Sequence, residues 1–147
     1  MGKVLAVCIS TRKGEQKKEI PQGECIIDFG IKGDAHGGNW HRQISLLGTE
    51  SVDEMRAKGL TLSNGDFAEN IVTEGISLKL LPIGTILSLG NEVELEVTQI
   101  GKECHSGCVI MKTAGKCVMP TDGIFAIVKK PGVIQAGDEI QVQNVYG

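Results

Sequence analysis

The sequence predicts a mainly β fold, built as a single-domain β-barrel or sandwich with a few short helices. Its 147 residues suit one domain, spanning residues 1–147. Twenty glycines against four prolines indicate many tight turns, and the apolar runs between them are short and rich in β-branched residues. Hydrophobic residues make up 41% of the chain but aromatic residues only 3%, so we expect an aliphatic core. Many short strands, glycine-rich turns and few helices favour a barrel or a sandwich.

In the N-terminal third, apolar runs predict strands at residues 4–10, 25–31 and 44–47. Cys8 and Cys25 lie inside the first two runs. We expect buried, unreactive thiols there, because a free cysteine packs as a small hydrophobic residue. The basic run at residues 12–18 is short, and it is expected to form a solvated loop.

One short helix is expected after the third strand. Ser51 and Glu54 have the spacing of a capping box, with Ser51 as the N-cap residue. Arg56 and Lys58 suit the end of a helix, and Gly59 can terminate it.

The C-terminal half contains the clearest strand signal. Residues 92–98 alternate strictly between polar and apolar side chains, as in a strand with one wet and one buried face. Gly90 and Asn91 before this run indicate a hairpin. Further strands are expected at residues 71–73, 85–89, 123–128 and 139–142.

Directly after the alternating strand, residues 101–125 concentrate the soft, nucleophilic chemistry of the chain. Three of its five cysteines fall here, at Cys104, Cys108 and Cys117. Cys104 has Lys102 two residues before it and His105 beside it, and nearby cations lower the pKa of a thiol. Cys104 is therefore the candidate reactive thiol, with His105 and Lys102 as candidate catalytic neighbours.

A second candidate region is the glycine-rich loop at residues 30–43, which also carries two histidines, an arginine and the only tryptophan. Glycines permit close approach of the backbone to a ligand, and Arg42 can fork onto a phosphate or carboxylate. The loop therefore suits an anionic or polar small molecule, with a plain surface turn as the alternative. Glu69 and Asn70, before the strand expected at 71–73, are either structural hydrogen bonders or ligand contacts.

Composition and charge exclude some classes of function. The net charge is −3, so nothing calls for a nucleic-acid partner. No window approaches the roughly 20 apolar residues of a membrane helix, and the N-terminal apolar run is too short for a signal peptide. We expect a cytoplasmic protein, in which clustered cysteines more often indicate metal binding or catalysis than disulfides.

Taken in order, several motifs resemble the MOSC domain, named for the C-terminal region of molybdenum cofactor sulfurase, in its small stand-alone bacterial type. They lie at residues 33–38, 67–71, 81–85, 101–105, 119–125 and 137–140. The resemblance implies a β-barrel associated with the molybdenum cofactor, a pyranopterin phosphate. It also implies that Cys104 carries sulfur as a persulfide or ligates molybdenum.

The resemblance further implies a shared site. Cys104 would work with His105 and Lys102, and the cofactor would be bound by Gly33, Asp34, His36, Gly37, Gly38, Arg42, Glu69 and Asn70. The expected partners are molybdenum-cofactor biosynthesis proteins or molybdoenzymes, and a sulfur donor such as a cysteine desulfurase. Pyridoxal phosphate would belong to that donor, because this chain is too short to contain a desulfurase domain.

Other hypotheses stay open. As an enzyme, the chain would be a sulfurtransferase or a molybdenum-cofactor-dependent reductase of N-hydroxylated compounds with an external redox partner. As a protein without catalytic activity, it would be a binding module. A small zinc site formed by Cys104, His105, Cys108 and Cys117 is a further alternative. Many MOSC domains lack Cys108 and Cys117, so another working thiol or a disulfide relay also stays open.

Overall fold

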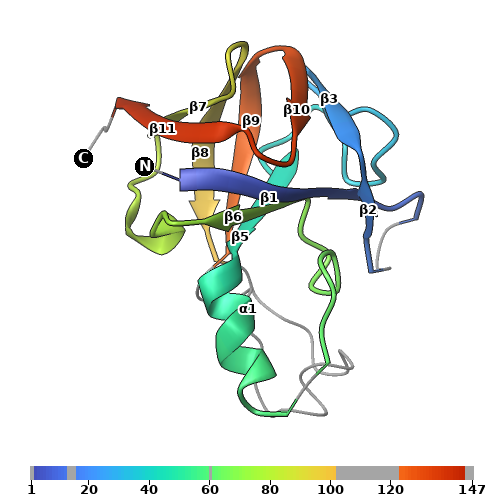
Figure 1. Ribbon diagram of the computed structural model, residues 1–147. Helices are drawn as coiled ribbons and strands as arrows, with labels where there is room; N and C mark the ends of the chain where they lie inside the picture. The colour runs from blue at the N-terminus through green and yellow to red at the C-terminus, as the bar shows by residue number, and fades with distance from the viewer. Residues whose placement is uncertain (1, 13–15, 60, 102–122, 145–147) are drawn as a thin grey trace.

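The computed structural model describes residues 2–12, 16–59, 61–101 and 123–144 (Figure 1). Its elements are β1 (Gly2–Ile9), β2 (Lys18–Ile20), β3 (Gln22–Ile26), β4 (Gly30–Ile31), β5 (Ile44–Gly48), α1 (Thr49–Arg56), β6 (Ile71–Glu74), η1 (Leu78–Leu80), β7 (Ile86–Leu89), β8 (Val93–Ile100), β9 (Ile124–Lys130), β10 (Gly132–Gln135) and β11 (Glu139–Asn144). No helix in these ranges is long and apolar enough to cross a membrane.

Seven of the described strands close into a barrel. Their order is β11-β7-β8-β9-β5-β6-β1, and β1 pairs back onto β11 to complete the ring. Neighbours are antiparallel except β5 and β6, which run parallel. A parallel pair needs a long crossover connection, and the chain between β5 and β6 contains α1, which projects below the barrel in Figure 1. The predicted mainly β barrel is confirmed, and the closure excludes the sandwich.

A second, three-stranded sheet in the order β10-β3-β4 lies against the barrel. Gly23 in β3 lies so close to β1 that an added Cβ would be 2.9 Å from Cγ1 of Val7. The small sheet therefore covers this side of the barrel, next to the glycine-rich loop that follows β4.

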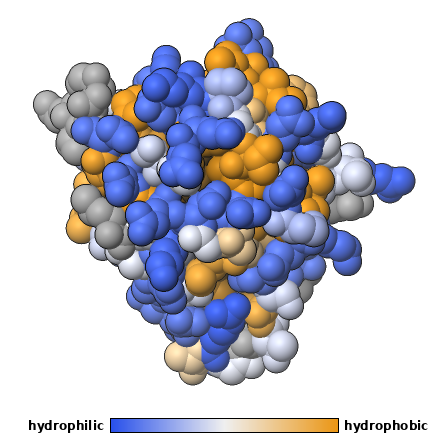
Figure 2. All heavy atoms as spheres, turned by 45° about the horizontal axis from the view of Figure 1, so that its top comes forward, coloured by the Kyte–Doolittle hydropathy of each residue, from blue (hydrophilic) through white to orange (hydrophobic). Residues whose placement is uncertain are grey.

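The core is aliphatic, as expected. The main cluster has members on most of the barrel strands, including Val4, Leu46, Ile71, Leu95 and Ile124. Strand β8 buries alternate residues, which confirms the period of two in the sequence. In Figure 2, hydrophilic residues cover much of one face, with apolar residues between them.

Both cysteines in the described ranges are buried, as predicted. Cys8 is 0% and Cys25 1% exposed. Burial is the main cause that raises the pKa of each thiol to about 12, and a nearby carboxylate contributes to that rise, from Glu69 at Cys8 and from Glu24 at Cys25. Neither thiol is therefore activated in the folded protein.

The predicted strand at residues 25–31 is wrong in its middle. The chain reverses between β3 and β4, so that Ile26 pairs with Gly30. Asp28 adopts a positive φ of 63°, which aspartate tolerates better than most residues. The turn overrides the strand propensity of the apolar run.

The predicted helix start is also wrong, by three residues, because the N-cap residue is Gly48 and not Ser51. Helix α1 begins at Thr49, with Gly48 as an N-cap residue that makes no side-chain hydrogen bond. Strand β5 leads directly into α1, so Ser51 already lies inside the helix. Glu50 in the first turn accepts a hydrogen bond from the amide of Gly75 at 2.7 Å. The end of the helix before Gly59, which has a φ of 94°, is as predicted.

Candidate functional site

Asp34 anchors the start of the glycine-rich loop. Its side chain is buried, and Oδ1 accepts hydrogen bonds from the amide of Ser10 at 3.1 Å and from Nζ of Lys17 at 2.7 Å. The other oxygen, Oδ2, accepts from the amide of His36 at 3.3 Å. Both carboxylate oxygens are thus engaged within the protein, and Asp34 ties the loop to the end of β1.

The expectation of a solvated loop is wrong for Lys17. Its side chain is 1% exposed, whereas the neighbouring Lys18 is exposed. The ammonium of Lys17 contacts three groups: Asp34 Oδ1, Ser10 Oγ at 3.2 Å and His36 Nδ1 at 2.9 Å. Three acceptors match the three protons of an ammonium group, which explains how the charge is buried. The sequence contains no signal that distinguishes Lys17 from the other basic residues of this run.

The glycines of the loop differ in their roles. An added Cβ at Gly37 would lie 2.4 Å from the ring of Phe29, so packing requires glycine there. Gly33 has a φ of 86°, and among the described residues an added Cβ would meet only Ile9, at 3.6 Å. At Gly38 the nearest atom is Cδ1 of Trp40, at 3.8 Å. The backbone at Gly33 and Gly38 is therefore the more open part of the loop.

Arg42, at the other end of the loop, is fastened to the end of β8. Its Nε donates to Oε1 of Gln99 at 3.0 Å, and its guanidinium carbon lies 5.2 Å from the ring centroid of Phe125. Nε2 of His41 contacts the same Gln99 oxygen at 2.9 Å. The stacked ring and the Nε bond fix the plane of the guanidinium. Within the described ranges, neither Nη nitrogen of Arg42 has a hydrogen-bond partner.

Gln99 extends this connection to Gly101, the first residue of the cysteine stretch. Its Nε2 donates to the carbonyl oxygen of Gly101 at 2.7 Å. The amide of Gly101 in turn donates to the carbonyl oxygen of Gly123 at 2.6 Å. The predicted residues Lys102, Cys104 and His105 follow Gly101 and lie outside the described residues.

Asn70 links β5 to β1 from a buried position. Its Oδ1 accepts hydrogen bonds from the amide of Ser45 at 2.9 Å and from its hydroxyl at 3.2 Å, while Nδ2 donates to the carbonyl oxygen of Cys8 at 3.0 Å. The side-chain amide of Asn70 therefore makes structural hydrogen bonds through both its oxygen and its nitrogen.

Glu69 is fully buried, at 0% exposure. Its Oε1 accepts a hydrogen bond from the amide of Phe67 at 3.0 Å, but Oε2 has no partner within the described ranges. Burial raises the pKa of the Glu69 carboxyl, while hydrogen bonds from backbone amides lower it in part. Ala68 before it has a positive φ of 63°, so the chain is turned tightly at this position.

We expect Glu69→Gln to change how stability depends on pH. Because the pKa of Glu69 is raised in the folded state, the unfolded chain ionises first as the pH rises, and folding then loses stability. Within that window the wild-type free energy of unfolding falls by about 1.4 kcal/mol per pH unit more steeply than that of the variant. Urea denaturation from pH 4 to pH 8 measures this difference, and exposed Glu74→Gln is the control. Parallel pH profiles for the wild type and Glu69→Gln would contradict it.

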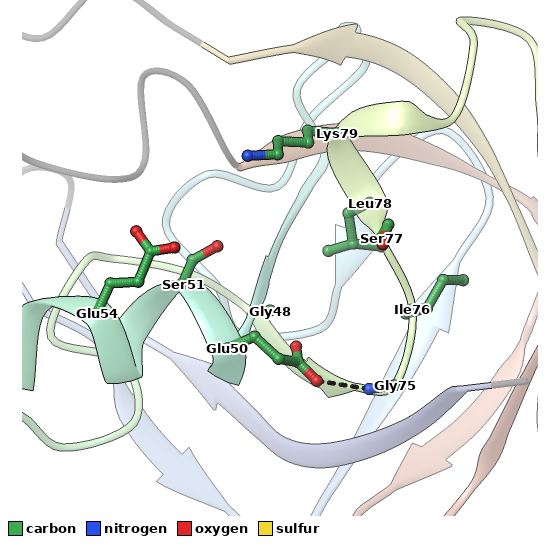
Figure 3. A pocket seen from close by; sticks show the side chains of 9 residues that line it. All are labelled: Gly48, Glu50, Ser51, Glu54, Gly75, Ile76, Ser77, Leu78 and Lys79. Carbon is green, nitrogen blue, oxygen red and sulfur yellow. Dashed lines mark hydrogen bonds between the residues drawn. The ribbon is translucent and has the colours of Figure 1, made fainter.

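The pockets lie apart from most of these residues. One of about 360 Å³ lies where Glu50, Ser51 and Glu54 of α1 face Ser77 and Lys79 near η1, as Figure 3 shows. Another, of about 500 Å³, borders β2 and includes Lys17 among its lining residues. No group of three or more histidine, cysteine, aspartate or glutamate residues in the described ranges suits a metal ion. We place the candidate site at the glycine-rich loop and the end of β8, where the guanidinium of Arg42 is held with nitrogens available to a ligand.

A comparison with known families identifies the family of this chain. The sequence model of the MOSC domain matches residues 32–141, which include most of the glycine-rich loop and all of the cysteine stretch. The chain therefore belongs to the MOSC domain family.

Solved structures support the same fold. The chain is similar to the YuaD protein of Bacillus subtilis, with a TM-score of 0.78 and 22% identity, covering 100% of this chain and 98% of that one. It is also similar to YiiM from Geobacillus stearothermophilus, with a TM-score of 0.72 and 16% identity over 98% and 76% of the two chains. The chain is similar as well to YiiM from Escherichia coli, with a TM-score of 0.65 and 18% identity, covering 98% of this chain and 71% of that one. At these identities the likeness establishes the fold alone. No curated protein matches the chain.

Proposed function

We propose that this protein handles the molybdenum cofactor and that Cys104 is its working thiol, carrying sulfane sulfur or ligating molybdenum. The observation that carries the proposal is the guanidinium of Arg42, stacked on Phe125 and tied through Gln99 to Gly101. It joins the loop expected to bind an anion to the strand end expected to present the thiol.

The described residues fit the anionic part of this cofactor. A phosphate is recognised best by a planar guanidinium that offers two parallel N–H donors. Arg42 has its Nε engaged, its plane fixed and both Nη nitrogens without a partner in the described ranges, so it offers such a fork. The sequence places Cys104 three residues after Gly101, and three residues of chain span at most about 11 Å.

The other residues have distinct roles in this proposal. Arg42 and Lys102 hold the anionic group, and the backbone at Gly33 and Gly38 allows close approach. Asp34 holds the loop on β1, while Glu69 and Asn70 support the scaffold beneath it. When bound, the cofactor supplies a molybdenum centre for atom or electron transfer.

The sulfur step would need a donor protein, such as a cysteine desulfurase. The Cys104 thiolate attacks the outer sulfur of the donor's persulfide, a new S–S bond forms on Cys104, and the donor's cysteine leaves as a thiolate. No oxidant or reductant is consumed. Lys102 and His105 would favour the Cys104 thiolate, because nearby cations lower the pKa of a thiol.

The test compares the wild type with Cys104→Ser after purification from cells that make the cofactor. Molybdenum, pterin and cyanide-labile sulfur are measured for each protein. We expect at least one of them in the wild type and its loss in Cys104→Ser. The loss should be about tenfold or more, because changing even an outer-shell partner of a metal ligand typically costs about 10–100-fold in metal affinity. Cys25→Ala is the matched control, since that thiol is buried and is expected to be dispensable.

An additional variant tests the Arg42 observation itself. Arg42→Gln is expected to reduce bound pterin and molybdenum while cyanide-labile sulfur on Cys104 is kept, and Arg12→Gln, an exposed arginine, is the control. Unchanged sulfur and molybdenum in Cys104→Ser would refute the role of this thiol. Stoichiometric zinc without either signal would instead favour the alternative zinc site.

A further inference from the structure

The ring of His36 is held by a lysine. Nζ of Lys17 lies 2.9 Å from Nδ1 of His36 and 2.7 Å from Oδ1 of Asp34. The side chains of Lys17 and Asp34 are 1% and 0% exposed. The amide of His36 also donates to Asp34, so backbone and ring are held by the same ion pair.

The direction of the ring contact follows from chemistry. An ammonium group has three donors and no acceptor, so Nδ1 of His36 must accept the proton offered by Lys17. A neutral imidazole that accepts at Nδ1 carries its own proton on Nε2. A protonated ring would place an N–H against the ammonium, with two like charges in contact.

We propose that Lys17 is a positioning residue that fixes His36 as the neutral Nε2–H tautomer. His36 then recognises its ligand as a hydrogen-bond donor to an oxygen, such as that of a phosphate or carbonyl, and does not coordinate a metal. Its role toward a ligand rests on the proposed function, whereas the tautomer rests on the contacts of Lys17 alone.

The hydrogen bonds around His36 differ from those around a metal-binding histidine. A ligating imidazole uses one nitrogen for the metal and donates the other N–H to a carboxylate, a carbonyl or water. In His36 the second nitrogen faces a donor, and the nearby carboxylate of Asp34 contacts its backbone amide and Lys17. Coordination through Nε2 would therefore require Lys17 to move away from Nδ1.

The experiment is a long-range proton–nitrogen NMR spectrum of the uniformly ¹⁵N-labelled full chain at neutral pH. The ring signals are assigned with His36→Gln, because the chain has three histidines. We expect Nδ1 at the shift of an unprotonated nitrogen and Nε2 at that of a protonated one, with no averaging between tautomers. Signals for Nδ1–H or for an imidazolium would overturn the proposal.

A second variant and a metal titration separate this role from a merely structural one. In Lys17→Met/Asp34→Asn, which removes both buried charges together, the His36 nitrogens are expected to shift toward exchange-averaged values. Added Zn²⁺ is expected to leave the wild-type His36 signals unchanged, and a saturable shift would overturn the inference. If Cys104→Ser keeps its sulfur and molybdenum while the tautomer is as stated, the proposed function fails and the positioning by Lys17 stands.

Discussion

Replacing Lys17 with methionine is expected to lower the free energy of unfolding by about 3–5 kcal/mol, since breaking a buried ion pair leaves an uncompensated charge. Methionine has nearly the length of the lysine stem, so little volume is lost. The carboxylate of Asp34 would keep only backbone donors, from Ser10 and His36. Thermal and urea denaturation at neutral pH measure the loss.

The neighbouring residue gives a matched control. Lys18 is exposed, and Lys18→Met is expected to change stability by no more than about 0.5 kcal/mol. Lys17→Met/Asp34→Asn should recover part of the loss, because the asparagine oxygen can still accept from the amide of Ser10 without a buried charge. Equal stabilities for Lys17→Met and Lys18→Met would show that Lys17 makes no buried ion pair in solution.

This lysine also marks a limit of sequence analysis. A basic run of residues is ordinarily solvated, and Lys17 differs from Lys18 only through its surroundings. Its partner Asp34 is 17 residues further along the chain. The backbone amide of Lys17 donates to Gly65 in yet another segment. Such burial depends on contacts between separate segments, which no local pattern encodes.

Local sequence patterns predicted the structure correctly where an element buries one face and exposes the other. The alternation at residues 92–98 predicted β8, because a half-buried strand requires that period. The capping box at Ser51 failed because the preceding strand sets where the chain enters α1. Arg42 was identified as a candidate anion binder from its type, but its partner Gln99 is 57 residues away. The family, and the expectation of a molybdenum cofactor, came from the resemblance of several motifs together, and not from periodicity or composition.

The second large effect is expected at Gly65, which lies against the backbone of Lys17. Gly65 has a φ of 93°, and an added Cβ would lie 2.1 Å from the carbonyl oxygen of Lys17. Its own carbonyl oxygen accepts from the amide of Lys17 at 2.8 Å, so the two segments cannot separate without breaking this bond. Gly65→Ala is therefore expected to lower the free energy of unfolding by about 2–5 kcal/mol, from backbone strain and steric overlap together.

Gly137→Ala separates the two causes. Gly137 has a similar φ of 98°, but an added Cβ there meets no described residue within 4 Å. Gly137→Ala should therefore lower the free energy of unfolding by about 1–2 kcal/mol, from backbone strain alone. Urea denaturation of both variants measures the difference, and equal losses would contradict the close approach of Gly65 to Lys17. Because the overlap displaces the backbone of Lys17, Gly65→Ala should also shift the ring nitrogens of His36, whereas Gly137→Ala should not. The substitution at Gly65 would then change the surroundings of His36 by displacing Lys17.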